Sequence, residues 1–168
     1  MSALEVLQSC PAQRKLLFST IGAVDVQDSN LIIFDLENST PRLPHQMAFQ
    51  IPVLVKNRPI FRIVIDEGAS TCIMSIQCWK SLGSPTLNQS PTILKAFDGR
   101  VFQPFGILQD LPIGVEGKIV NLDVEVVDAP LDYNLLLGHS WSYAMTYVVS
   151  SVFRLIKFPY QGKIVTID

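Results

Sequence analysis

The chain has 168 residues, 48% of them hydrophobic and 17% charged, with 13 basic and 15 acidic side chains and a net charge of −2. This length fits one domain, with or without an extension, and the low charge favours an additional surface buried in an oligomer. The charge balance argues against direct binding to nucleic acid, and no apolar run reaches the roughly 20 residues that cross a bilayer.

The first 45 residues differ from the rest and are predicted to form a partly helical N-terminal extension or linker. Residues 11–18 fit a short helix, residues 31–34 a short strand, and residues 38–44 a linker rich in proline and polar residues. The N-terminus lacks the basic and apolar regions of a signal peptide, so we do not expect secretion. Whether residues 1–45 pack on the following domain or join it to a preceding segment is left open.

Residues 46–168 predict an all-β, barrel-like domain with one or two short helices. Short apolar strands alternate with turn residues, and the clearest turns are residues 56–59 and the pair Asp98-Gly99. The expected strands are 49–55, 60–65, 71–74, 92–97, 100–102, 120–126, 153–158 and 163–167, and the expected helices are 76–82 and 139–145.

Segment 120–126 alternates strictly between apolar and polar residues, so we expect one buried face and one wet face. Asp123 and Glu125 fall on the wet face of this pattern, without the spacing of a calcium loop. His45 and His139 likewise lack the spacing of metal ligands. We therefore expect no metal site.

The most informative stretch is 63–71, Ile-Val-Ile-Asp-Glu-Gly-Ala-Ser-Thr, in which an apolar strand delivers one carboxylate to a turn that contains glycine. A carboxylate at the end of such a run makes sense where a site holds an acid in a low-dielectric pocket that tunes its pKa. Gly68 can adopt a positive φ or admit another backbone closely. We interpret this stretch as a functional site built around Asp66.

This stretch resembles the active-site loop of the retropepsin-like aspartic proteases. In that family the loop has seven successive positions. Two apolar residues come first, then an Asp, then either Ser or Thr, then a Gly, then either Ala or Ser, and last either Ser or Thr. A second segment, 133–141, resembles the later apolar-apolar-Gly motif of the same family, here Leu136, Leu137 and Gly138, which leads into a short helix. The two motifs occur in the order and at the separation expected of one retropepsin unit.

A third segment, 158–165, is similar to the closing strand of retropepsins from plant LTR retrotransposons of the Ty3/Gypsy type, which are part of a gag-pol polyprotein. The resemblance implies a closed β-barrel with the acid-protease fold over residues 46–168. It also implies an aspartic endopeptidase that needs no metal and no organic cofactor. Its substrate would be polypeptide, namely its own polyprotein, in the cytoplasm or within virus-like particles.

Peptide hydrolysis by this family requires two carboxylates that share one proton. One acts as a base toward water while the other donates to the scissile carbonyl. The chain offers one such loop, so the resemblance implies a homodimer in which Asp66 pairs with its own copy across a two-fold axis.

Further roles follow from the resemblance. Asp66 is the expected catalytic residue, and Ser70 is expected to hydrogen-bond its carboxylate. Gly138 is expected to let the strand of Leu136 and Leu137 pass close to the active-site loop. A hairpin is expected to close over the substrate as a mobile flap, although a plain surface turn fits its sequence too. The loop residues are Glu67, Gly68, Ala69 and Ser70, and the flap residues are Ala96, Phe97, Asp98, Gly99 and Arg100.

Glu67 is the departure from the family pattern, which has Ser or Thr at this position to lock the two loops together. Glu donates a hydrogen bond only when it is protonated. We therefore expect dimerisation and activity to be strongest in acid. A second reading is a catalytically inactive module that keeps the retropepsin fold for dimerisation or peptide binding. A nucleic-acid-binding β-barrel is disfavoured by the acidic balance.

Overall fold

The computed structural model describes residues 48–96 and 98–167, together with Cys10, Ala12, Leu16, Thr20, Ile32 and Phe34. The helix expected at 11–18, the strand at 31–34, the linker at 38–44 and Phe97 of the hairpin lie outside the described residues, apart from isolated positions. The division into an extension over 1–45 and a domain over 46–168 stays a prediction.

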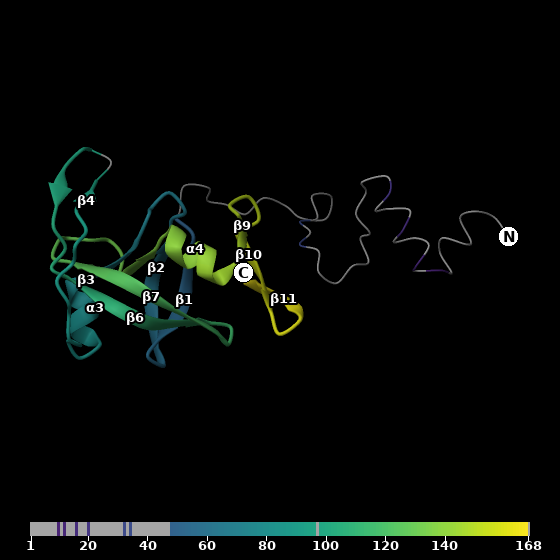
Figure 1. Ribbon diagram of the computed structural model, residues 1–168, viewed down its shortest axis with the longest axis horizontal. Helices are drawn as coiled ribbons and strands as arrows, with labels where there is room; N and C mark the ends of the chain where they lie inside the picture. The colour runs from purple at the N-terminus through teal and green to yellow at the C-terminus, as the bar shows by residue number, and fades with distance from the viewer. Residues whose placement is uncertain are drawn as a thin grey trace.

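The described chain is mostly β, and its strands close into the expected barrel (Figure 1). Apolar residues fill the interior, where Val55, Ile63 and Met74 have no solvent exposure. Strand β6 pairs back onto β1, which leaves the barrel without a free edge. Around the barrel the order is β1 (Gln50–Val55), β2 (Arg58–Ile65), β8 (Leu135–Leu137), β3 (Cys72–Ser75), β7 (Lys118–Val127) and β6 (Gly106–Val115).

Both short helices expected in the domain are present, as α3 (Ile76–Ser81) and α4 (His139–Met145). Ser75 caps α3, because its Oγ accepts a hydrogen bond from the Cys78 N–H at 3.1 Å. None of the helices in the described part of the chain combines the length and apolar character that crossing a bilayer requires.

Two smaller sheets accompany the barrel. Strands β4 (Leu94–Lys95) and β5 (Val101–Phe102) form a short hairpin that projects from the barrel (Figure 1). Strands β9 (Val148–Ser150), β10 (Leu155–Tyr160) and β11 (Lys163–Ile167) form an antiparallel sheet with β10 in the middle.

The turn of the first hairpin is shorter than expected. Lys56 and Asn57 alone form it, with φ of 48° and 62°, and Arg58 already pairs with Val55. Two consecutive positive φ values match the twist of paired strands, so the pairing continues up to the turn. Pro59 therefore lies within β2 and not in the turn.

Strand β6 is not predicted by the sequence pattern. Its pairing with β7 shifts register between Leu108 and Leu111, and Asp110 between them has a φ of 53°. This bulge breaks the alternation of apolar and polar residues on which a strand prediction rests. Strand β9 is likewise unpredicted, and the strand expected at 153–158 begins at Leu155.

Glu125 is buried, which corrects the expectation that it lies on the wet face of its strand. Its exposed fraction is 2%, whereas Asp123 is exposed as expected. Ser90, from a distant part of the sequence, donates a hydrogen bond to Glu125 Oε1 at 2.9 Å. Alternation along a strand predicts which face a residue takes, but not what packs on that face.

Candidate active site

Strand order brings the two sequence motifs together. Strand β8 pairs in parallel with β2, with Ile65 opposite Leu137, and antiparallel with β3. The carboxyl ends of β2 and β8 therefore lie side by side, which places Asp66 next to Gly138. Leu136 and Leu137 are buried, in keeping with a structural role for this segment.

Asp66 lies at the mouth of the barrel, directly after β2. Its N–H donates to the Leu137 carbonyl at 3.0 Å, and its own carbonyl accepts from the Ala69 N–H at 3.2 Å. The Gly68 N–H donates to Asp66 Oδ1 at 2.9 Å, which orients the carboxylate within the loop. The Asp66 side chain is exposed in the single chain, as is Ser70.

Gly138 is the point of closest approach between the two motifs. A Cβ at this position would lie 2.2 Å from the Thr71 carbonyl oxygen and 2.7 Å from the Ala69 carbonyl oxygen. Real Cβ atoms do not approach backbone atoms this closely, so only glycine fits. The next residue continues the contact, because the His139 N–H donates to the Ala69 carbonyl at 2.7 Å.

Cys72 ties the start of α4 to the strand that leaves the active-site loop. The Gly138 N–H points to Cys72 Sγ at 3.4 Å, and the Ser140 Oγ lies 3.3 Å from the same sulfur. Cys72 is buried and is a free thiol. The active-site loop is therefore attached at both ends, by the hydrogen bond of Asp66 to Leu137 where it begins and by the contacts of Cys72 where it ends.

Glu67 faces a tyrosine of its own chain. The Tyr147 side chain is 8% exposed, and burial raises the pKa of its hydroxyl well above the usual range. The negative Glu67 carboxylate nearby raises the Tyr147 pKa further, while the hydrogen bond from Ser142, at 2.9 Å, acts in the opposite direction. Glu67 itself is exposed in the single chain.

Tyr133 is a second aromatic residue near the loop. Burial raises the pKa of its hydroxyl, and the negative charge of Asp66 adds to the shift. Sequence reasoning assigned no role to Tyr133 or Tyr147. Tyr133 is the first residue of segment 133–141, which contains the apolar-apolar-Gly motif, and this is a usable signal. Nothing in the local pattern around Tyr147 points to the site.

The predicted hairpin turn is formed as expected. Gly99 has a φ of 86°, the Ala96 N–H donates to the Arg100 carbonyl at 2.8 Å, and the Gly99 N–H donates to the Ala96 carbonyl at 2.9 Å. Asp98 and Arg100 form an exposed ion pair at 2.6 Å. Strands β4 and β5 are shorter than predicted, and Ile93, Val101 and Phe105 leave apolar surface exposed near them.

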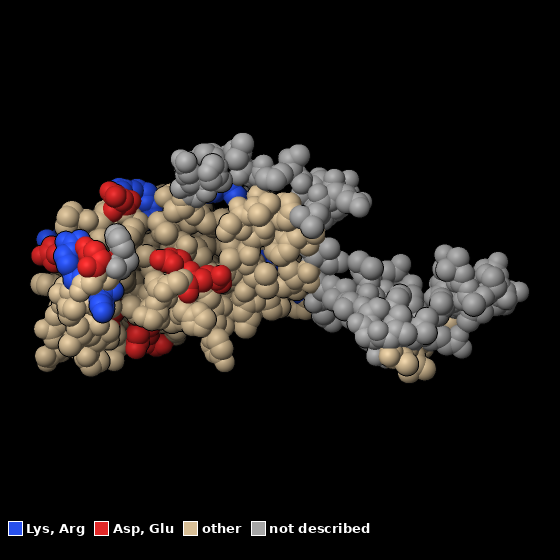
Figure 2. Space-filling view, turned by 90° about the horizontal axis from the view of Figure 1, so that it is seen from above, with Lys and Arg blue, Asp and Glu red and all other residues tan. Residues whose placement is uncertain are grey.

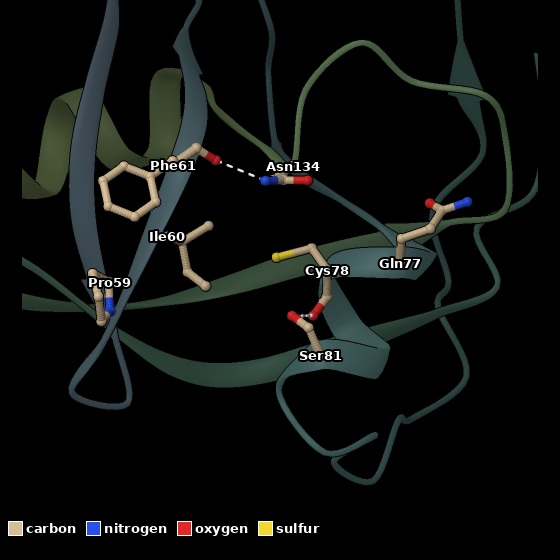
Figure 3. A pocket seen from close by; sticks show the side chains of 7 residues that line it. All are labelled: Pro59, Ile60, Phe61, Gln77, Cys78, Ser81 and Asn134. Carbon is tan, nitrogen blue, oxygen red and sulfur yellow. Dashed lines mark hydrogen bonds between the residues drawn. The ribbon is translucent and has the colours of Figure 1, made fainter.

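A cavity of about 270 Å³ lies between β2 and α3, apart from the Asp66 loop (Figure 3). The Cys78 thiol points toward Ile60 across it, and burial raises the pKa of that thiol. On the wall, Asn134 Nδ2 donates to the Phe61 carbonyl at 2.8 Å. The lining residues are Pro59, Ile60, Phe61, Gln77, Cys78, Ser81 and Asn134, so the cavity does not include the predicted site.

The charged surface is mixed in sign. On the face shown in Figure 2, basic and acidic side chains are interspersed toward one end of the barrel, and most of the remaining described surface is uncharged. In the part of the chain that the structure describes, no three His, Cys, Asp or Glu side chains are grouped so that they could hold a metal ion.

Several solved structures are similar to this fold. The retroviral protease-like domain of Ddi1 from Leishmania major matches with a TM-score of 0.56 and 12% identity, over 72% of this chain and 94% of that chain. A retropepsin-like aspartic protease from Rickettsia conorii matches with a TM-score of 0.50 and 22% identity, over 62% and 78% of the two chains. EIAV protease complexed with the inhibitor HBY-793 matches with a TM-score of 0.51 and 15% identity, over 71% and 99%. No family model and no curated protein matches the sequence.

These similarities define the class of fold. The chain has the retropepsin-like fold of the aspartic proteases, as the two sequence motifs predict. With identities of 12% to 22%, the comparisons show the fold alone. The assignment of activity depends on the residues at the mouth of the barrel.

Proposed function

We propose that the chain is one subunit of a homodimeric aspartic endopeptidase. The observation that carries this proposal is the placement of Asp66 at the end of β2. There, its N–H donates a hydrogen bond to the Leu137 carbonyl, its carboxylate accepts one from the Gly68 N–H, and Gly138 packs against the backbone of the loop. The loop presents its carboxylate outward, which supports a site completed by a second subunit.

The chemistry requires a second carboxylate close to Asp66. The loop brings one aspartate to the barrel mouth, and a two-fold axis at this point would bring its copy. Two carboxylates a few ångströms apart cannot both ionise easily, so they hold one proton between them. The ionised member would take a proton from water while the protonated member donates to the peptide carbonyl. Water is the nucleophile, so the reaction needs no metal.

The exposed apolar residues of the hairpin region support a role in holding an extended peptide. Ile93, Val101 and Phe105 are more than half exposed, at 68%, 62% and 56%. A peptide strand bound below this hairpin would cover apolar surface and exclude water from the carboxylates. The natural substrate we propose is the polyprotein of a plant LTR retrotransposon of the Ty3/Gypsy type, cleaved in the cytoplasm or within virus-like particles.

Hydrolysis of a denatured protein by the purified full chain at acid pH tests the proposal. The matched control is Asp66→Asn, which keeps the shape of the side chain and removes the acid. We expect the wild type to cleave and the variant to lose at least about 1000-fold in rate, as removal of an essential general base or acid does. Equal cleavage by both proteins would exclude Asp66 as the catalytic group.

The second candidate function is a dimerising or peptide-binding module without catalysis. Glu67 is the observation that favours it, because an additional carboxylate beside Asp66 adds a like charge where the dyad must hold one proton. Tight binding of an unstructured peptide by both the wild type and Asp66→Asn, with cleavage by neither, would support this function.

A further inference from the structure

Segment 85–93 leads from α3 to the β4–β5 hairpin and lies against β6. Asn88 and Ile107 exchange two backbone hydrogen bonds, of 3.0 and 2.9 Å. Gly106 makes this contact possible, since a Cβ there would lie 2.9 Å from Leu87 Cβ and 3.0 Å from the Asn88 carbonyl oxygen. The segment is therefore fixed to the barrel at residues 87 and 88, six residues before β4 begins.

Ser90 makes a further attachment, closer to the hairpin. Its Oγ donates to Glu125 Oε1 on β7 at 2.9 Å and accepts from the Thr92 N–H at 3.0 Å. Both partners of the first bond are buried, with exposed fractions of 4% for Ser90 and 2% for Glu125. Among the described residues, this is the last side-chain hydrogen bond to the barrel before β4.

The Glu125 carboxyl is only half satisfied. Its Oε2 is buried and has no hydrogen-bond partner among the residues that the structure describes. The residues opposite it on the neighbouring strands, Ile73 and Ile107, are apolar. A buried polar atom without a partner destabilises a fold, so stability alone does not explain why a carboxyl occupies this position. The hydrogen bond that Oε1 accepts from Ser90 is a reason for a carboxyl here.

We propose that Ser90 and Glu125 form a clasp that sets the position of the β4–β5 hairpin relative to the Asp66 loop. This inference rests on the proposed function, in which the hairpin covers bound peptide. The two residues are positioning residues, because neither is part of the Asp66 loop. With one hydrogen bond to the barrel wall, the clasp can open and re-form while the strand ladder of β6 and β7 stays intact.

The exchange rates of backbone amides with solvent deuterium test the clasp without substrate. The informative variant is the double substitution Ser90→Ala with Glu125→Met, which removes both partners and fills the site with apolar atoms. Removing both partners costs little global stability, unlike removing one. Ser90→Ala also removes the acceptor of the Thr92 N–H, so amide 92 is left out of the comparison. We expect amides 93–96 to exchange about tenfold faster, the ratio that corresponds to the loss of one hydrogen bond, with an unchanged melting temperature.

Gln109→Ala is the matched control. It removes a hydrogen bond of 2.6 Å from Asn88 on the same segment, at an exposed position farther from the hairpin. We expect the exchange of amides 93–96 to be unchanged in this variant. If amides 93–96 of the double variant exchange as slowly as in the wild type, the clasp is overturned. Faster exchange throughout β6 and β7 would also overturn it, because the pair would then merely hold the barrel together.

Peptide hydrolysis separates the clasp from the proposed function. In an active enzyme, the double variant should raise KM severalfold and change kcat less, because the hairpin contacts the peptide and not the reacting atoms. Absence of hydrolysis in the wild type would reject the protease while leaving the exchange result standing. A fall in kcat alone would contradict a positioning role for the clasp.

Discussion

Gly138 and the Thr71 carbonyl oxygen are packed so closely that a Cβ on Gly138 would lie 2.2 Å from that oxygen. This contact joins two segments that are far apart in the sequence and holds the loop of Asp66 against the end of β8. The catalytic geometry that we propose depends on this contact, because no side chain could occupy the gap without moving the loop.

Gly138→Ala should therefore destabilise the fold strongly. The new methyl group meets backbone atoms that cannot rotate away, so we expect a loss of about 3 kcal/mol or more in the free energy of unfolding, together with loss of activity. Urea denaturation measures the loss. The control is Gly114→Ala, whose Cβ would find its nearest neighbour at 3.4 Å and should cost less than about 1 kcal/mol. Similar stabilities for the two variants would contradict the account of the contact.

Dimerisation should weaken as the pH rises. In the proposed dimer, two Asp66 and two Glu67 side chains gather near one axis, and protonation in acid relieves the repulsion between them. Sedimentation at about pH 4, where ordinary Asp and Glu carboxyls are partly protonated, and at about pH 8 measures the effect, and we expect the dissociation constant to rise at least tenfold between them.

Glu67→Thr provides the control for this pH dependence. Threonine restores a hydroxyl that can both donate and accept, and it removes two carboxylates from the dimer. The variant should dimerise with a smaller change between the two pH values. Equal dimerisation of the wild type in acid and in alkali would show that Glu67 does not lie near the axis.

Tyr147 should make the fold sensitive to alkali. Burial raises the pKa of its hydroxyl, and the Glu67 carboxylate adds to the shift. Because the folded-state pKa lies above the unfolded value of about 10, this contribution to stability is fully present below pH 10 and is lost as the pH rises toward the folded-state value.

Tyr147→Phe tests this sensitivity in urea denaturation at about pH 8 and about pH 11. At pH 8 the variant should be about 1 kcal/mol less stable, because it loses the hydrogen bond with Ser142. At pH 11 the difference should shrink or reverse, because phenylalanine does not ionise. Tyr143→Phe, at a side chain that is 81% exposed, is the control and should leave the pH dependence of the wild type in place. A constant difference between wild type and Tyr147→Phe would contradict the burial argument.

The sequence predicts the features that are encoded locally. The carboxylate after a β-branched run, the Asp98-Gly99 turn and the two short helices expected at 76–82 and 139–145 appear where their patterns place them. Strand β6 escapes prediction because a bulge at Asp110 interrupts its alternation. Glu125 and Tyr147 escape for another reason: their partners, Ser90 and Glu67, are 35 and 80 positions away in the sequence, and burial of this kind depends on the complete fold.

The central claim is that each active site needs an Asp66 from two subunits, and mixed dimers test it most directly. Wild-type and Asp66→Asn chains are unfolded together in equal amounts, refolded, and assayed for peptide hydrolysis at fixed total concentration. If both carboxylates are required, only dimers of two wild-type chains cleave, and activity falls to about one quarter of the pure wild type. Activity of about one half would mean that each chain works alone, and would contradict the shared site.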